Sequence, residues 1–224
     1  MKIPEKKKQI QSDHINEKKG KLYLFTSYTP GAGKSYLMIS KAMEEKAKAR
    51  KVAIGYLNGS HRDIKKMLDD NGLDLSEKKR YSLERLIAEN PDLVIMDELG
   101  ARGKNKRFVY EDVEVFLNAG IDVYTTANLK KFDSANPLFK QVTGIGIRRS
   151  IPDRFLEMAE CIYFVDREPE WMMKDFRDGK LFGEKYMKSK IMQKNFQKET
   201  LINYRNISKN YLKKYADKVK IVIR

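Results

Sequence analysis

The chain of 224 residues carries a formal net charge of +15, and 41% of its residues are hydrophobic. That apolar content supports a packed core of ordinary domain size, and no apolar run approaches the ~20 residues of a membrane-spanning helix. The lysine-rich N-terminus is not followed by the apolar stretch of a signal peptide, so we expect a cytoplasmic protein. One cysteine, Cys161, and two histidines, His14 and His61, exclude an internal disulfide and are too few for a zinc site.

The positive charge is concentrated at the two ends of the chain. Residues 1–20 contribute +3 and residues 181–224 contribute +9, so the part between them is nearly neutral. We interpret residues 1–20 as a basic flexible tail, residues 21–180 as an α/β domain, and residues 181–224 as a basic helical extension. The extension offers a surface to an anionic partner, although lysines on solvated helical faces explain the same composition.

Short apolar runs alternate with helical patterns through the central domain. Strands are expected at residues 22–25, 52–57, 93–96, 121–127 and 161–165, and helices over 35–49, in two pieces within 62–89, and over 111–119. This alternation is typical of a mostly parallel sheet with helices on both faces. We therefore predict an α/β fold of the doubly wound, phosphate-loop NTPase type.

The C-terminal extension has a helical pattern with one apolar and aromatic stripe. Its members recur at spacings of three and four residues, and they are Leu201, Tyr204, Ile207, Tyr211, Tyr215 and Val219. Such a stripe is typical of packing against the domain or against a second copy of the chain. We expect the lysines between them, such as Lys209, Lys213 and Lys218, to stay in solvent.

A glycine-rich loop lies between the first expected strand and the first expected helix. It consists of Pro30, Gly31, Ala32, Gly33, Lys34 and Ser35, with Tyr36 following in the helix. Glycines let backbone N–H groups surround a phosphate, and the helix N-terminus adds partial positive charge. Lys34 is then expected to reach the β- and γ-phosphates of ATP, and Ser35 to bind Mg²⁺. A chance glycine-rich turn is the alternative, against which the flanking strand and helix argue.

Polar residues also follow two later strands. Asp97 and Glu98 end the third expected strand; Asp97 is placed to hold Mg²⁺ through water, and Glu98 lies where many phosphate-loop ATPases keep the catalytic base. Asn128 follows the fourth strand, where it contacts the γ-phosphate or the attacking water, or equally well makes only a turn. Weaker candidates for phosphate contacts are Arg148, Arg149 and Arg154.

Six stretches together carry a resemblance to a known family: residues 24–36, 54–56, 97–99, 111–114, 118–128 and 142–144. In this order they resemble the N-terminal domain of the KdpD family of potassium-responsive sensor histidine kinases. The resemblance implies a cytoplasmic regulatory module that binds ATP at the phosphate loop, with Asp97 on the metal side. The general Walker A pattern has a glycine at the position of Tyr28, and the resemblance implies that relatives share its absence.

The sequence departs from the KdpD pattern near the expected γ-phosphate, at residues 58–61 and 100–103. We therefore expect Mg-ATP or Mg-ADP binding with slow hydrolysis at most, and no histidine kinase activity, because the kinase domain of relatives is missing from this sequence.

The leading hypothesis is a nucleotide-dependent switch in potassium or osmotic two-component signalling, acting on another signalling protein or a second subunit. The alternative is a P-loop ATPase that acts on nucleic acid through its basic C-terminal helices. A small-molecule kinase is less favoured, because a thymidine-kinase-like enzyme would need a zinc ribbon.

Overall fold

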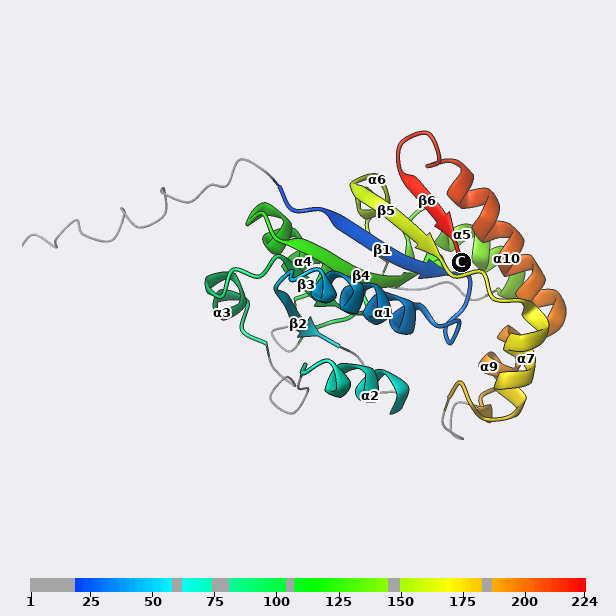
Figure 1. Cartoon of the computed structure of the whole chain (residues 1–224). Helices are drawn as coiled ribbons and strands as arrows, with labels where there is room; N and C mark the ends of the chain where they lie inside the picture. The colour runs from blue at the N-terminus through cyan, green and yellow to red at the C-terminus, as the bar shows by residue number, and fades with distance from the viewer. Residues whose placement is uncertain (1–18, 58–61, 74–80, 104–106, 145–149, 183–186) are drawn as a thin grey trace, which may run out of the picture.

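The computed structural model describes residues 19–57, 62–73, 81–103, 107–144, 150–182 and 187–224. Within these ranges, parallel strands form one six-stranded sheet in the order β2-β3-β4-β1-β5-β6 (Figure 1). The strands are β1 (Leu22–Ser27), β2 (Val52–Tyr56), β3 (Leu93–Met96), β4 (Asp122–Asn128), β5 (Ala159–Phe164) and β6 (Lys220–Ile223). The predicted α/β class with a parallel sheet is confirmed.

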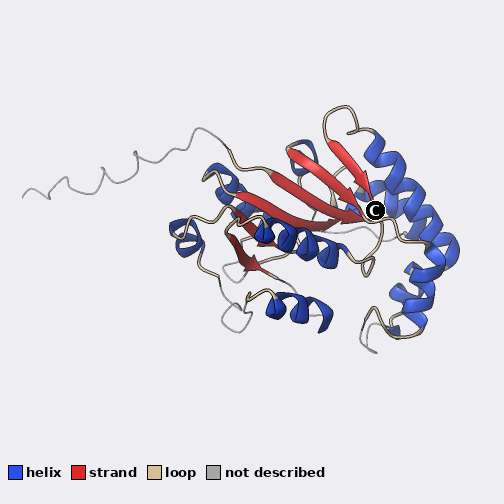
Figure 2. Cartoon of the chain, viewed as in Figure 1, coloured by secondary structure: helices blue, strands red, loops and turns tan. Residues whose placement is uncertain are grey.

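Helices connect the strands and lie on both sides of the sheet (Figure 2). In the described ranges they are α1 (Lys34–Ala47), α2 (Arg62–Asp70), α3 (Leu83–Ala88), α4 (Val109–Asn118), the 3-10 turn η1 (Leu129–Lys131), α5 (Asn136–Thr143), α6 (Arg154–Glu157), α7 (Pro169–Arg177), α9 (Lys190–Asn195) and α10 (Lys198–Lys213). None of these helices combines the length and hydropathy that a membrane crossing requires.

Alternation along the strands divides the apolar residues between two cores. On β1, Phe25 belongs to the core under α1 and α2, whereas Leu24 belongs to the core under α4. On β3, Ile95 belongs to the core under α1 and α2, and Val94 belongs to the core under α4. Successive side chains of a strand point to opposite faces, so a strand that is apolar throughout requires a helical layer on each side. The sheet is therefore covered by helices on both faces.

The stripe of the C-terminal extension packs against the domain, as one of its two predicted roles required. Leu201, Tyr204 and Tyr211 on α10 are buried in the larger core, and α10 lies beside α5 and α7. The chain then returns to the sheet and adds β6 beside β5, a strand that the sequence pattern did not single out. A four-residue edge strand buries little of its surface, so it lacks a clear apolar alternation.

A group of ion pairs fixes α10 to the connection between β5 and α7. Arg205 donates from Nε and Nη2 to the two carboxylate oxygens of Asp166, at 2.6 and 3.0 Å, and from Nη1 to Glu168 at 2.7 Å. Lys209 lies 2.6 Å from Asp166 with 37% of its side chain exposed, so it is only partly in solvent, whereas Lys213 and Lys218 are exposed as predicted. Burial opposes ionisation of Asp166, but these hydrogen bonds hold its pKa below the ordinary value.

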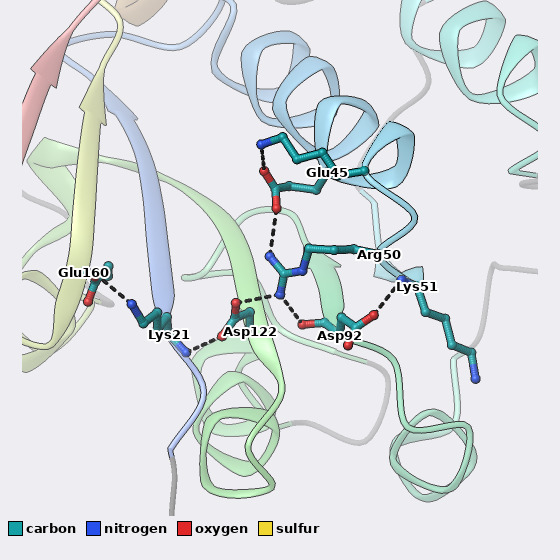
Figure 3. A network of polar contacts seen from close by, with 8 residues as sticks. Lys21, Glu45, Arg50, Lys51, Asp92, Asp122 and Glu160 are labelled. Carbon is teal, nitrogen blue, oxygen red and sulfur yellow. Dashed lines mark hydrogen bonds and ion pairs between the residues drawn. The ribbon is translucent and has the colours of Figure 1, made fainter.

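A second polar network lies at the amino ends of the strands (Figure 3). Arg50, just before β2, donates to Glu45 of α1 at 2.9 Å, to the Asp92 carbonyl at 2.9 Å and to the Asp122 carboxylate at 2.7 Å. Asp122 also accepts the backbone N–H of Lys21 at 2.7 Å. One guanidinium therefore joins the C-terminal end of α1 to the starts of three strands, at the edge opposite the phosphate loop.

Replacing Arg50 is expected to lower stability without affecting the opposite edge of the sheet. Arg50→Met leaves the partly buried carboxylates of Glu45 and Asp122 without their shared partner, a loss of about 2 kcal/mol in the free energy of unfolding. Lys21→Ala is the matched control, because Lys21 pairs with Glu160 in solvent and such pairs contribute little. Urea unfolding checks both variants, and equal losses would contradict the structural role given to Arg50.

Candidate functional site

A cavity of about 390 Å³ opens at the carboxyl ends of β1, β3 and β4. Ligands of open α/β sheets gather at this edge, because the loops after parallel strands meet there. The cavity brings together most of the predicted site residues, namely Pro30, Gly31, Lys34, Ser35, Asp97, Glu98 and Asn128. Gly33 and Tyr36 line a second hollow of about 270 Å³ on the other side of the loop, and Ala32 is buried beneath it.

The backbone of the loop requires glycine at two positions. Gly31 has a φ of 81° and Gly33 a φ of 100°, both in the left-handed region that side chains disfavour. A Cβ on Gly31 would also lie 3.2 Å from Leu181, whereas one on Gly33 would meet nothing within 4 Å. Helix α1 begins at Lys34 without a side-chain cap, so its first N–H groups are available to an anion.

Lys34 extends back over the loop that precedes it. Its ammonium donates to the Ser27 hydroxyl at 3.0 Å and to the Thr29 carbonyl at 3.5 Å. Burial lowers the pKa of Lys34 to about 8, against the attraction of Asp97 and Glu98. A negatively charged ligand would raise this pKa again, because it stabilises the ammonium form.

Asp97 joins the phosphate loop to the middle of the sheet. Its Oδ1 accepts hydrogen bonds from the Ser35 hydroxyl at 3.1 Å and from the Thr126 hydroxyl at 2.5 Å. The residue is 1% exposed, so its carboxylate is positioned by these contacts rather than by water. A serine hydroxyl beside a carboxylate at a phosphate loop is a set of oxygen ligands that suits Mg²⁺. Thr126, which orients that carboxylate, was not singled out as a site residue from the sequence.

Glu98 occupies an unusual backbone conformation directly after Asp97. Its φ is 51°, a left-handed value that costs a non-glycine residue free energy. The surrounding backbone holds it there: the N–H of Glu98 donates to the Thr126 hydroxyl at 3.0 Å, and its carbonyl accepts the N–H of Ala101 at 2.7 Å. This turn places Glu98 at the wall of the cavity.

Asn128 contributes a buried acceptor to the cavity. The residue is 7% exposed, and its Oδ1 has no hydrogen-bond partner among the described residues. A buried polar atom without a partner costs about 1 to 3 kcal/mol, so such an atom in a cavity wall favours a ligand or a bound water that donates to it. The hydrogen-bonded Ser35 hydroxyl and Asp97 carboxylate are oxygen groups of the kind that a hydrated Mg²⁺ takes, and the orphaned oxygen lies in the wall of the same cavity.

Two lysines that were not predicted as site residues also line the cavity. Lys130 and Lys131 follow Asn128 in η1, and their positive charges add to the lowering of the pKa of Lys34. Lys130 is partly buried, its ammonium lies 5.6 Å from the centre of the Tyr204 ring, and burial lowers its pKa to about 8. Their place just after the carboxyl end of a strand is the sequence signal that could have identified them.

Tyr28 takes a structural role where the Walker A pattern has glycine. Its side chain is fully buried, and its hydroxyl donates to the Arg167 carbonyl at 2.6 Å. Arg167 in turn pairs with Asp175 on α7. The phosphate loop is thereby attached to the connection that Arg205 fixes to α10.

Of the three arginines predicted as weaker candidates, Arg154 is described by the structure, and it is not among the residues that line the cavity. Arg154 donates to Glu114 at 2.7 Å and lies over the Phe155 ring, away from the residues that line the cavity. Arg148 and Arg149 lie outside the described residues, as do His14 and His61.

The sequence was also compared with known families and proteins. The profile of the family described as "KdpD: Osmosensitive K+ channel His kinase sensor domain" matches residues 18–219. The chain belongs to this family. It is 29% identical over 230 residues to the sensor protein KdpD of Clostridium acetobutylicum, covering 96% of this chain and 25% of that protein. It is 31% identical over 217 residues to the sensor protein KdpD of Escherichia coli, covering 90% of this chain and 23% of that protein.

The chain spans about a quarter of the length of these two KdpD relatives. The match covers the strands from β1 to β5 and the whole of α10, so the C-terminal helices belong to the KdpD sensor domain together with the sheet. The predicted resemblance to the KdpD family is confirmed.

Replacing Lys130 is expected to stabilise the fold in a pH-dependent way. Lys130→Met removes a partly buried ammonium, next to Lys131 and across the cavity from Lys34, and keeps the apolar length of the side chain. Between the folded pKa of about 8 and the ordinary value of 10.5, the unfolded chain holds the proton that the folded chain releases, so wild-type stability rises with pH.

The midpoint of thermal unfolding of Lys130→Met should therefore exceed that of wild type at pH 7, and the difference should shrink between pH 8 and pH 10.5. A constant difference across this range would show that burial of the ammonium is not the cause.

Proposed function

We propose that this chain is a nucleotide-binding regulatory module that holds Mg-ATP or Mg-ADP at the carboxyl edge of its sheet. The observation that carries the proposal is the meeting of Lys34, Ser35 and Asp97 at one cavity, from segments 62 residues apart. A cation, a metal-binding hydroxyl and a buried carboxylate are the groups that phosphate-loop proteins use for nucleotides.

Each residue has a distinct role in the proposed site. The N–H groups at the start of α1, between Gly31 and Tyr36, surround the β-phosphate, and Lys34 leaves Ser27 to contact the β- and γ-phosphates. Ser35 binds the metal directly and Asp97 holds its water shell. Bound Mg²⁺ would offset part of the negative charge of the phosphates. Asn128 accepts a hydrogen bond from water in the cavity.

Hydrolysis is expected to be slow. Glu98 is the only carboxylate besides Asp97 among the described residues that line the cavity, and it would be the group that orients water. A regulatory switch needs only different affinities of its two conformations for the ligand, so fast turnover is not required of it. Turnover near the ~10 s⁻¹ typical of enzymes would contradict this part of the proposal.

The signalling role follows from family membership and from the connection between the loop and α10. We propose that the module acts in potassium or osmotic two-component signalling, on another signalling protein or on a second subunit. Tyr28 and Arg167 attach the phosphate loop to the segment that Arg205 fixes to α10, so a change at the loop has a direct route to that helix. The alternative of a nucleic-acid ATPase has less support, because Arg205 and Lys209 are already engaged by Asp166.

Lys34→Ala tests the proposed site. We expect nucleotide affinity to fall by tenfold or more, because a charge-assisted contact is usually worth about 1.5 to 3 kcal/mol. Lys48→Ala is the matched control, since the exposed Lys48 lies at the other end of the same helix and pairs with Glu45, away from the cavity. Isothermal titration calorimetry with Mg-ADP measures both variants, and an unchanged affinity in Lys34→Ala would refute the assignment.

Asp97→Asn tests the metal side of the site. The amide keeps hydrogen bonds to Ser35 and Thr126 but loses the charge that attracts the metal. We expect weaker nucleotide binding in Mg²⁺ and little change in EDTA, so the ratio of the two dissociation constants should fall toward one. An equal loss in both conditions would indicate damage to the fold and would argue against a metal at this place.

A further inference from the structure

Lys130 is a partly buried cation at the wall of the cavity, and the nucleotide binding proposed above assigns it no role. It is the second residue after Asn128, in a turn that the fully buried side chain of Leu129 anchors to the core. The anchor fixes the backbone of Lys130 at the wall of the cavity. The fold therefore places Lys130 at the site, and its ammonium does not have to reach the site from a mobile surface position.

The contacts of Lys130 leave its charge without a partner of opposite sign. Its one assigned contact is the face of the Tyr204 ring, 5.6 Å from the ammonium, and among the described residues no carboxylate forms an ion pair with it. A cation over an aromatic ring is attracted by about 0.5 to 2 kcal/mol, less than burial of an ammonium usually costs. The lowered pKa of Lys130 agrees with this imbalance.

The charges around the cavity indicate what would complete these contacts. Three lysines line it, Lys34, Lys130 and Lys131, against the two carboxylates of Asp97 and Glu98. Asp97 already accepts hydrogen bonds from Ser35 and Thr126. Like charges gather at a site only where an anion or a fixed negative charge offsets their repulsion. An extended anion that reaches from the phosphate loop to η1 supplies this charge.

We infer that Lys130 binds the terminal phosphate of a nucleoside triphosphate and exchanges its contact with Tyr204 for that phosphate. The diphosphate lacks the group that would reach Lys130, so Lys130 distinguishes the triphosphate from the diphosphate. The inference rests on the nucleotide site proposed above, and it adds the residue whose contact depends on the presence of the terminal phosphate.

The exchange has a consequence for α10. Tyr204 is buried on that helix, and its hydroxyl donates to Asn195 of α9 at 2.8 Å. Loss of the lysine from its ring changes the packing between η1 and the two C-terminal helices. The next residue, Arg205, carries the ion pairs that fix α10 to the segment after β5. The terminal phosphate is thereby linked to the helices at the C-terminal side of the domain.

The test compares a diphosphate and a non-hydrolysable triphosphate on the same protein. Calorimetry with Mg-ADP and Mg-AMPPNP gives two dissociation constants for wild type and for each variant. We expect Lys130→Met to weaken AMPPNP binding by about tenfold or more while changing ADP binding less than about threefold. Lys130→Arg keeps the charge and should recover part of the preference. Lys140→Met, on the exposed side of α5, is the matched control and should change neither constant.

Hydrogen exchange supplies a second measurement. Its difference between the two nucleotides would not depend on Lys130 if that residue had only a structural role. In wild type, the amides around Tyr204 and Arg205 should exchange at different rates in AMPPNP and in ADP, and this difference should vanish in Lys130→Met. If wild type binds neither nucleotide, the proposed function is wrong and this inference falls with it. If wild type binds both and Lys130→Met keeps the wild-type ratio of dissociation constants, only the role of Lys130 is wrong.

Discussion

The hydrogen bonds that Asp97 accepts from Ser35 and Thr126 are the contacts on which the proposed site depends. They join the start of α1 to the carboxyl ends of β3 and β4. The residues proposed to bind the phosphates and those proposed to bind the metal ion are therefore held in place by the same carboxylate. Because the carboxylate is buried, its position is set by the sheet and not by solvent. The contacts proposed for the nucleotide depend on this placement. Glu98, the next residue, has a strained backbone conformation beside it.

Two sets of contacts connect the surroundings of the cavity to the C-terminal helices. Tyr28 contacts the segment after β5, and Arg205 fixes the same segment to α10. Lys130 approaches α10 from the other side of the cavity, through the Tyr204 ring. The phosphate loop and η1 thus reach one helix by two separate routes, which suits a switch better than an enzyme optimised for turnover.

Much of the core was predictable, because strands with apolar residues on both faces and a glycine-rich loop leave strong local patterns. The strand at residues 93–96 was predicted with the bounds of β3, and the family was predicted from motifs in order. Helix α6 has four residues, too few to show a helical period, and β6 lies at an edge where little is buried. The place of Lys130 at the cavity and the ion pair of Lys209 with Asp166 were not predicted, because lysine is usually a surface residue and only the fold shows which lysines meet a cavity or a buried carboxylate. The arrangement of the predicted site residues around one cavity likewise required the structure.

The most direct measurement is a map of backbone amide shifts in ¹⁵N-labelled protein on addition of Mg-AMPPNP. We expect large shifts for Gly31 to Tyr36, for Glu98 and for residues 128–131, and small shifts at the opposite edge of the sheet around Arg50. Shifts confined to the exposed groove between α5 and α10, or no saturable shifts at millimolar nucleotide, would contradict a nucleotide site at the phosphate loop.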